Sequence, residues 1–447
     1  PEISILFKQE PPLGKKQVTY RIPALIYISD KQTFLAFAEK RKTPSDTDAD
    51  VLVMRKGLWK NDNQVEWVSD QQVFTSACLP NHRSMNPCPV YERESKNLFL
   101  FFICVPLGVS ERKQIKENKN QARLCYITSK DTGETWSAVS DLTADVIGEQ
   151  EKNWATFAVG PGHGVQMKSG RLIIPAYTYR YTDKPVCTLC CCLSFCTPYA
   201  LAFHSDDQGI TWKAGQQMDV ESCECQMAEI VGEKGDSTLY CNARTRLGYR
   251  TEALSNNAGE DFDTVLSSSK LIETGKGCQG SVLSFVEQSS PPQTWLLYSH
   301  PSNPKKRVDL GLYLNKSPLD SSGWVQALSE SKGTDFDTSS SVNKLIETGN
   351  GCQGSVLSFT PDQASEKTWL LYCHPTNATN RLTLGIYLNK CASDLSGWGN
   401  PVILHEGPSG YSDLTQCGDG KHFACLMECG EKSELEGIGF ILFEQKD

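Results

Sequence analysis

Short apolar runs separated by turn-forming residues cover nearly the whole chain. The runs hold four to eight residues and lie between clusters rich in glycine, proline, asparagine and aspartate, whereas the spacing of an amphipathic helix is almost absent. The clearest strand segments cover residues 18–28, 33–41, 50–57, 97–105, 122–129, 171–179, 237–244 and 280–285. The pattern predicts an all-β chain, built either from several sandwiches or as one radial assembly of small sheets.

A local motif favours the radial assembly. Residues 129–136 (SKDTGETW) return as residues 205–212 (SDDQGITW), and a weaker third version covers residues 255–262 (SNNAGEDF). Each version follows a predicted strand. The acidic or amide residue is suited to accept backbone N–H groups within a turn, the glycine to adopt a positive φ, and the aromatic residue to pack beneath the loop. The motif predicts architecture and says little about chemistry.

A second repeat is a near-identical duplication. Residues 270–285 (KLIETGKGCQGSVLSF) recur 74 positions later as residues 344–359 (KLIETGNGCQGSVLSF), and Trp324 recurs at the same offset as Trp398. We interpret residues 1–447 as one domain that contains a tandem-duplicated, blade-sized unit at 261–334 and 335–408. A closed ring holds a fixed number of blades for a given strand twist, so the extra copy should widen the ring, displace its twin or prevent folding.

Composition and charge exclude several classes of protein. Apolar residues make up 39% of the chain and charged residues 22%, which is unlike a disordered or coiled-coil chain. Asp and Glu outnumber Lys and Arg by 53 to 44, and the net charge of −9 argues against a nucleic-acid partner. The longest apolar run, residues 98–105, is far shorter than the roughly 20 residues that span a bilayer. The start of the chain shows no signal-peptide pattern, so we expect a soluble or peripherally attached protein.

The 19 cysteines do not indicate a disulfide scaffold. Their number is odd, and the chain is long enough to form its own core, which together favour a reducing compartment. One cluster stands apart, and its five members are Cys187, Cys190, Cys191, Cys192 and Cys196. Reversible acylation of a surface loop and an unmodified loop both remain open for this cluster, while its spacing fits a tetrahedral zinc site poorly.

Several motifs together resemble the animal exo-α-sialidases, or neuraminidases. They are the repeated turn motif and the segments 20–23 (YRIP), 81–87 (NHRSMNP), 156–163 (TFAVGPGH) and 410–414 (GYSDL). Within that family, the segments 38–41, 101–105, 154–157 and 224–229 are most similar to the plasma-membrane branch that cleaves gangliosides. The resemblance implies a six-bladed β-propeller with its site at the centre of one face, here with one extra blade-sized unit. It also implies hydrolysis of terminal sialic acid from gangliosides and other sialoglycoconjugates.

A sialoside carries a carboxylate on its anomeric carbon, and arginine offers paired donors to such a group. The resemblance implies three carboxylate-binding arginines, of which Arg21 and Arg244 match two. The duplication supplies two candidates for the third. Arg307 keeps the family's local motif, whereas Arg381 belongs to the unit that leads directly into Tyr411, so the choice stays open.

The same resemblance assigns the reacting groups. Tyr411 matches the nucleophile, and a neutral phenol suits this role because a carboxylate would be repelled by the carboxylate of the sugar. Glu224 matches the base that activates the phenol, while Glu229 is interpreted as a structural partner. Asp46 matches the general acid and base. The mechanism implied is retaining.

Further matches line the sugar pocket of the family, although each residue alone is also typical of a core or surface position. They are Glu39, Arg41, Met85, Asn86, Glu111, Tyr177 and Tyr179.

The acidic stretch 45–50 does not match a calcium-binding EF-hand loop, because it lacks the glycine and the terminal glutamate of such a loop. No metal or nucleotide motif is present, and we expect no cofactor.

The expected partners are sialylated glycolipids and glycans. We expect peripheral attachment to the plasma membrane, with the cytoplasm and endosomes as further locations. Two other functions remain open from the sequence: a catalytically impaired propeller that binds sialosides, and a scaffold for protein partners. The duplication also leaves open a poorly folded variant.

Overall fold

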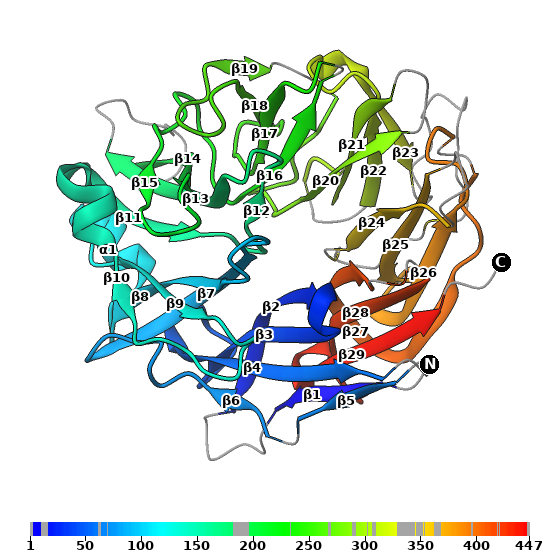
Figure 1. The fold of residues 1–447 in the computed structure, drawn as a ribbon, viewed down its shortest axis with the longest axis horizontal. Coiled ribbons are helices and arrows are strands. Elements are labelled where there is room, and N and C mark those ends of the chain that lie inside the picture. Colours follow the sequence, from blue (N-terminus) through cyan, green and yellow to red (C-terminus); the bar gives the residue numbers. More distant parts are fainter. Residues whose placement is uncertain are drawn as a thin grey trace.

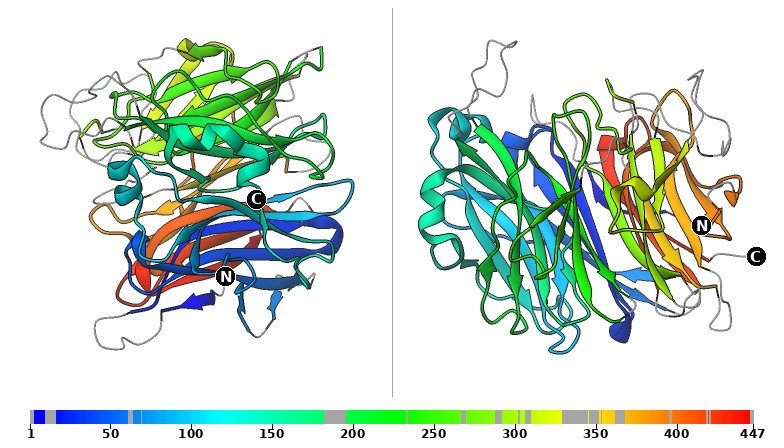
Figure 2. Two further views of the ribbon diagram at one scale, coloured as in Figure 1. Left: turned by 90° about the vertical axis from the view of Figure 1, so that its left-hand side faces the viewer. Right: turned by 90° about the horizontal axis from the view of Figure 1, so that it is seen from above.

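The computed structural model describes most of the chain. The described residues are 3–9, 17–60, 64–68, 70–181, 196–232, 234–266, 270–287, 292–301, 303–305, 310–328, 345, 352, 354–361, 368–394, 397–417, 419 and 421–444. In this part of the chain, hydrogen-bonded antiparallel sheets stand side by side around a common axis (Figure 1). Seen from the side, their strands cross the ring from one face to the other (Figure 2).

The first three sheets follow the chain order. The first holds β2 (Thr19–Ile28), β3 (Thr33–Arg41), β4 (Ala49–Trp59), β5 (Val65–Trp67) and β6 (Gln72–Val73). The second holds β7 (His82–Tyr91), β8 (Leu98–Pro106), β9 (Arg123–Ser129) and β10 (Ser140–Asp141). The third holds β11 (Trp154–Val159), β12 (Val165–Gln166), β13 (Leu172–Tyr181), β14 (Cys196–Ser205) and β15 (Lys213–Ala214).

The remaining sheets complete the ring. The fourth holds β16 (Cys225–Val231), β17 (Ser237–Ala243), β18 (Thr251–Ser255) and β19 (Thr264–Leu266). The fifth holds β20 (Ser281–Glu287), β21 (Gln293–Pro301), β22 (Leu310–Asn315) and β23 (Trp324–Leu328). The last, seven-stranded sheet holds β24 (Ser355–Phe359), β25 (Trp369–Pro375), β26 (Leu382–Asn389), β27 (Val402–Gln416), β28 (His422–Cys429), β29 (Gly437–Glu444) and β1 (Ser4–Lys8).

Helices are short and few among the described residues. They are the α-helix α1 (Glu111–Glu117), a π-helical turn at Thr143–Ile147, and 3-10 turns at Ser29–Lys31, Asp46–Asp48, Gly148–Asn153, Ser321–Gly323 and Glu434–Glu436. No helix in this part of the chain is long and apolar enough to cross a membrane. The eight predicted strand segments all fall on observed strands, which confirms the all-β prediction.

The seven-stranded sheet consists of two units joined by the long strand β27. Its first half pairs with β26 and its second half, from Ser409 onwards, pairs with β28. Counted in this way, seven inner strands of the described chain follow one another round the ring: β2, β7, β11, β16, β20, β24 and β27. Strand β27 then contacts β2, and the amino-terminal β1 pairs with the carboxyl-terminal β29. The predicted propeller with an additional unit is therefore the observed fold.

The two copies of the repeat form neighbouring units with the same strand register. Ser281 faces Ser299 in the first copy, and Ser355 faces Cys373, 74 positions later, in the second. The pairing of Asn315 with Trp324 likewise returns between residues 389 and 398. Apolar residues of both units pack in one shared cluster, so the second copy extends the ring through the same kind of contact that joins other units.

The turn motifs have the geometry that their residues predict. In the first, the Ser129 hydroxyl accepts the N–H of Gly133 at 2.7 Å, and Asp131 accepts the N–H of Thr135 at 2.9 Å. The glycines of the three versions have φ of 81°, 84° and 90°, a region that side chains disfavour. Trp212 of the second version packs against Phe99 and Phe101 of the neighbouring sheet. These turns therefore fasten one unit to the next.

No disulfide bond joins the cysteines that the structure describes, and most of these cysteines are buried. Four members of the cysteine cluster, Cys187, Cys190, Cys191 and Cys192, lie outside the described residues. Cys196 corrects the expectation of a surface loop, because it begins β14 and is 1% exposed. It occupies this place because β14 is buried along its whole length.

A buried carboxyl group links the fourth and fifth units. Oε1 of Glu252, a fully buried residue, accepts hydrogen bonds from the Tyr240 hydroxyl at 2.8 Å and from the Trp324 indole at 2.6 Å. Its Oε2 has no hydrogen-bond partner among the described residues. Burial raises the pKa of Glu252 to about 7, although both hydrogen bonds and Arg250 oppose the shift. At the junction between the fifth and sixth units, Gly311 occupies the register position that Glu252 has in the fourth unit. The indole N–H of Trp398, the counterpart of Trp324, is buried there and has no partner within the described chain.

We predict that Glu252→Gln removes a pH dependence of stability. In the wild type, the protonated carboxyl stabilises the fold below pH 4.5, and this contribution is lost as pH rises towards 7, because the unfolded chain ionises first. The difference in unfolding free energy between variant and wild type should shift by up to about 3 kcal/mol across this range. Chemical denaturation at several pH values measures it, with the exposed Glu66→Gln as control. A difference that is constant with pH would contradict the prediction.

Candidate active site

One cavity of about 1040 Å³ occupies the centre of the ring. Each of the seven inner strands contributes residues to its wall, from Arg21 on β2 to Tyr411 on β27. Twelve of the fourteen candidate residues line this cavity: Arg21, Glu39, Arg41, Asp46, Met85, Asn86, Glu111, Tyr177, Tyr179, Glu224, Arg244 and Tyr411. Arg381 is not one of the lining residues, but its guanidinium lies over the Tyr411 ring, and Arg307 lies outside the described residues.

Two guanidinium groups lie over the ring of Tyr411. The central carbon of Arg21 is 5.6 Å from the centre of the tyrosine ring, and that of Arg381 is 5.7 Å from it. Two carboxylates hold the cations: Arg21 Nε donates to Glu428 at 2.7 Å, and Arg381 donates to Glu434 at 3.4 Å. Burial alone would lower the pKa of Arg21, but the Glu428 carboxylate, Tyr411 and Asp46 raise it. Both guanidinium groups beside Tyr411 therefore stay charged.

Glu224 and Arg244 form a second charged pair in the cavity. The Arg244 guanidinium donates to Glu224 Oε2 at 2.7 Å and to the carbonyl of Lys276 at 3.1 Å. The Arg244 N–H donates to the Glu224 carbonyl at 3.0 Å and the Arg244 carbonyl accepts the N–H of Cys223 at 2.7 Å, so the entry of β16 is joined to the exit of β17 and both side chains begin at fixed points. Burial opposes the charged form of Arg244, yet the Glu224 carboxylate, together with Cys223 and Tyr179, raises its pKa. About a quarter of each side chain remains accessible to the cavity.

Asp46 projects from a short turn at the cavity mouth. Its side chain is 81% exposed, and its carboxylate accepts a 2.6 Å ion pair from Arg41, whose side chain is 2% exposed. Arg41 also binds the buried Glu39, which in turn accepts the backbone N–H of Asn86 at 2.7 Å. A rigid, buried pair thus supports one exposed carboxylate.

The other acidic residues of this loop have different partners. Asp48 accepts the hydroxyl of Thr43, and Asp50 pairs with Lys42 at 3.0 Å. In the described part of the chain, no three His, Cys, Asp or Glu side chains gather as a metal ion would require.

Glu111 and two tyrosines line the side of the cavity between these charged groups. The Glu111 side chain reaches solvent, but it lies inside the concave site. Desolvation there raises the pKa of Glu111, and the nearby Glu224 and Asp46 carboxylates raise it further. Tyr177 and Tyr179 contact each other edge to face, and burial raises the pKa of both phenols. They are therefore neutral walls of the site.

Irregularities in the strands position several of these side chains. The register shifts between Arg21 and Ala24 on β2, between Met85 and Cys88 on β7, and between Ser409 and Ser412 on β27. Ile22 and Asn86, within the first two shifts, have φ of 59° and 60°, which is unusual for residues other than glycine. Bulges re-aim side chains beside active sites, and here all three lie on the cavity wall.

Sequence reasoning missed the carboxylates that hold the arginines. Glu428 and Glu434 lie far along the chain from Arg21, and only the closed ring brings Glu428 within reach of it. The strand pattern gave one signal, since Glu428 is a charged residue within an otherwise apolar run. Glu229 has the predicted structural role, accepting the N–H of Lys168 at 2.8 Å and the hydroxyl of Ser237 at 2.6 Å.

Comparisons with known proteins agree with this picture. The family model described as a BNR repeat-like domain matches residues 32–351. Sialidase-3 of Homo sapiens is 43% identical over 99% of this chain and 92% of its own length. Sialidase-4 of Mus musculus is 40% identical over 100% of this chain and 94% of its own. Sialidase-2 of Mus musculus is 44% identical over 77% of this chain and 93% of its own.

Solved structures show the same fold at low identity. The intramolecular trans-sialidase from Ruminococcus gnavus, in complex with oseltamivir carboxylate, superposes with a TM-score of 0.56 at 15% identity, covering 95% of this chain and 94% of that one. The Trypanosoma rangeli sialidase in complex with sialic acid gives a TM-score of 0.53 at 13% identity, covering 99% of this chain and 58% of that one.

The predicted resemblance is thus confirmed by relatives that match along the whole chain, and the fold agrees with theirs. The chain belongs to the animal sialidase family, and it is a glycoside hydrolase of the exo-sialidase class.

Proposed function

We propose that the central cavity is the active site of a retaining exo-α-sialidase that acts on gangliosides and other sialoglycoconjugates. The observation that carries this proposal is the position of Tyr411 next to the guanidinium groups of Arg21 and Arg381, on the wall of the cavity that also contains Asp46 and Glu224. A tyrosine surrounded by cations suits attack next to a carboxylate.

In this proposal the arginines hold the substrate carboxylate. Arg21 uses Nε for Glu428, and among the described residues neither of its Nη atoms has a hydrogen-bond partner, so a paired set of donors can face a ligand. Arg244 approaches from the fourth unit. We assign the third position to Arg381 rather than Arg307, because Arg381 lies over the Tyr411 ring.

Tyr411 then attacks the anomeric carbon, and Glu224 takes the phenol proton. The covalent bond forms between the phenol oxygen and the sugar as the bond to the departing oxygen breaks. Positive charge develops on the sugar ring in this step, next to the substrate's own carboxylate. A neutral phenol is not repelled by that carboxylate, as an anionic nucleophile would be.

Asp46 serves as general acid and then as general base. Its exposure at the cavity mouth lets it reach the departing oxygen, which it protonates, and later the water that hydrolyses the intermediate. Arg41 holds this loop through the ion pair with Asp46 and a hydrogen bond to the carbonyl of Pro44, so the carboxylate is positioned without being buried.

Exposed apolar side chains beside the cavity favour the proposal that the substrates are membrane-bound. Leu107 is 55% exposed and lies between the cavity-lining Val105 and Ser110. Leu247 is 63% exposed and Tyr249 47% exposed, in the loop that follows Arg244. We propose that this rim faces a lipid surface, so that a ganglioside headgroup enters the cavity from the membrane.

We predict that Tyr411→Phe lowers turnover of a fluorogenic sialoside at least about 100-fold, because the ring is kept and only the nucleophilic oxygen is lost. Thermal unfolding should match the wild type, and Tyr126→Phe, a phenol outside the cavity, should keep full activity. Unchanged turnover in Tyr411→Phe would refute the assignment. A wild-type chain that binds an unsaturated sialic acid analogue without hydrolysing any sialoside would instead favour an impaired, sialoside-binding propeller.

We predict that Arg381→Gln lowers kcat/KM about 30- to 100-fold, because losing a charge-assisted hydrogen bond costs roughly 2–3 kcal/mol. Arg307→Gln should stay close to the wild type in the same steady-state assay. The opposite ranking would assign the third carboxylate-binding position to Arg307.

We predict that Leu107→Asp and Leu247→Asp each lower hydrolysis of a ganglioside in lipid vesicles about tenfold, since partial burial of a leucine contributes about 1.5 kcal/mol. Leu319→Asp is the matched control. Leu319 is 57% exposed and lies between the third and fourth strands of its sheet, whereas Leu247 lies between the second and third strands of its own sheet, so the two loops are on opposite faces of the ring. Equal losses in all three variants, or equal losses on a soluble fluorogenic sialoside, would argue against a membrane-facing rim.

A further inference from the structure

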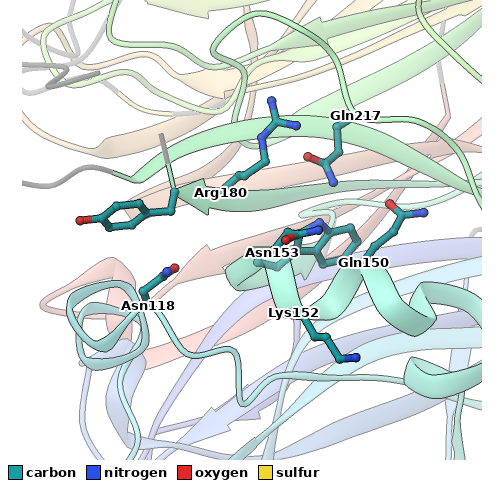
Figure 3. Close-up of a pocket in the computed structure, with 8 residues that line it drawn as sticks. Asn118, Gln150, Lys152, Asn153, Arg180 and Gln217 are labelled. Atoms are coloured by element: carbon teal, nitrogen blue, oxygen red, sulfur yellow. The ribbon is translucent and has the colours of Figure 1, made fainter. Parts of the chain in front are cut away.

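A second hollow, of about 380 Å³, lies outside the central cavity and shares no lining residue with it. The turn after α1, the 3-10 turn Gly148–Asn153 and the end of β13 form its sides. Figure 3 shows Arg180 and Gln217 on one side of it and Asn118, Gln150 and Asn153 on the other. Its size is at the lower end of the roughly 300–1,000 Å³ common for ligand pockets.

The hollow contains a cation without a carboxylate partner. Among the described residues, no Asp or Glu lies within 4.0 Å of the Arg180 guanidinium, which stacks on the ring of Tyr199 with 4.6 Å between the central carbon and the ring centre. The stacking and the pairing of β11 with β13, which places Arg180 opposite Trp154, fix the guanidinium in place. Lys152, by contrast, is paired with Glu149. Arg180 therefore retains donors for an anionic group.

Exposed amide side chains without protein partners also line the hollow. The side chains of Asn118, Gln150 and Asn153 make no hydrogen bond to a described residue. Gln217 Oε1 and the indole N–H of Trp154, a residue that is 1% exposed, are both buried without a partner. The exposed amide groups and the Arg180 guanidinium therefore present donors and acceptors to the hollow that no described protein group uses.

The amide side chains and the arginine of the hollow are suited to bind an acidic sugar. Amide side chains donate and accept at once, as the hydroxyl groups of a sugar require, and an unpaired arginine binds a carboxylate through paired donors. We propose that the hollow is an accessory binding site for an acidic sugar residue of a sialylated glycan.

The hollow lies close enough to the central cavity to bind a second sugar during hydrolysis. Glu111, at the start of α1, lines the central cavity, and Asn118, which caps the end of the same helix, lines the hollow. The helix has 7 residues, and a helix rises 1.5 Å per residue, so the two sites are separated by roughly 10 Å along α1. A second acidic sugar on the same glycan or on a neighbouring one could occupy the hollow while the first is hydrolysed. This proposal does not depend on which residues catalyse hydrolysis.

The test measures binding to the full chain with the central cavity occupied. Saturation-transfer NMR with 3′-sialyllactose reports binding elsewhere when the unsaturated sialic acid analogue is added only in the smallest amount that abolishes hydrolysis, because the analogue is itself an acidic sugar and in excess would compete for the hollow. We expect a residual signal for the wild type, and at least a fivefold loss of that signal in Arg180→Gln and in Gln217→Ala. Arg123→Gln is the matched control, because Arg123 lies outside the hollow and is paired with Asp141. Thermal unfolding checks that each variant is folded.

Each other outcome overturns the proposal. No residual signal in the wild type, or an undiminished signal in both hollow variants, would show that this is not a sugar site. A residual signal of the same size with lactose, which carries no carboxylate, would reject the acidic sugar as the ligand. Displacement of the signal by millimolar inorganic phosphate, equal to that by added sialic acid, would show a general anion site instead.

Discussion

Closure of the ring is the constraint on which the site depends. Arg21 and Glu428 are 407 positions apart in sequence, yet a 2.7 Å hydrogen bond joins them because β1 pairs with β29 and β27 lies against β2. Glu428 also accepts the backbone N–H of Tyr411 at 3.4 Å. One carboxylate therefore links the first and last units of the ring and orients both an arginine and the candidate nucleophile. A change that breaks this junction removes the contacts that hold Arg21 beside Tyr411.

The ring closes around the site although it contains a duplicated unit. Arg21, Arg381 and Tyr411 come from units that are neighbours at the junction, whereas Glu224 and Arg244 lie on the fourth unit. The first copy of the repeat, with β20 as its inner strand, stands between the fourth unit and the unit that holds Arg381. The central cavity includes residues from both copies, among them Ser281 and Ser355. The ring has thus absorbed the extra copy by adding a unit on one side of the site, while the three groups at the closing junction stay together.

The sequence predicted what local patterns control. Strands such as 33–41 and turns such as 129–136 follow from apolar runs and from the conformational needs of aspartate and glycine, and these are decided within a few residues. The candidate site came from motifs that resemble a family, and the cavity gathers most of those residues. Glu428 and Glu434 were missed because their importance arises from partners distant in the chain. Arg180 and Gln217 were missed because polar residues in connecting segments form no pattern. Cys196 was misplaced because its neighbours in sequence suggested a loop, whereas burial of β14 decided its position.

The central claim is that a seven-unit ring still directs its arginines at one sugar. A crystal structure of the full chain with an unsaturated sialic acid analogue tests it most directly. The account predicts the carboxylate of the analogue within about 3 Å of guanidinium nitrogens of Arg21, Arg244 and Arg381, with the Tyr411 hydroxyl facing the anomeric carbon. A carboxylate bound at the junction with Arg244 out of reach, or an analogue bound away from Tyr411, would contradict it.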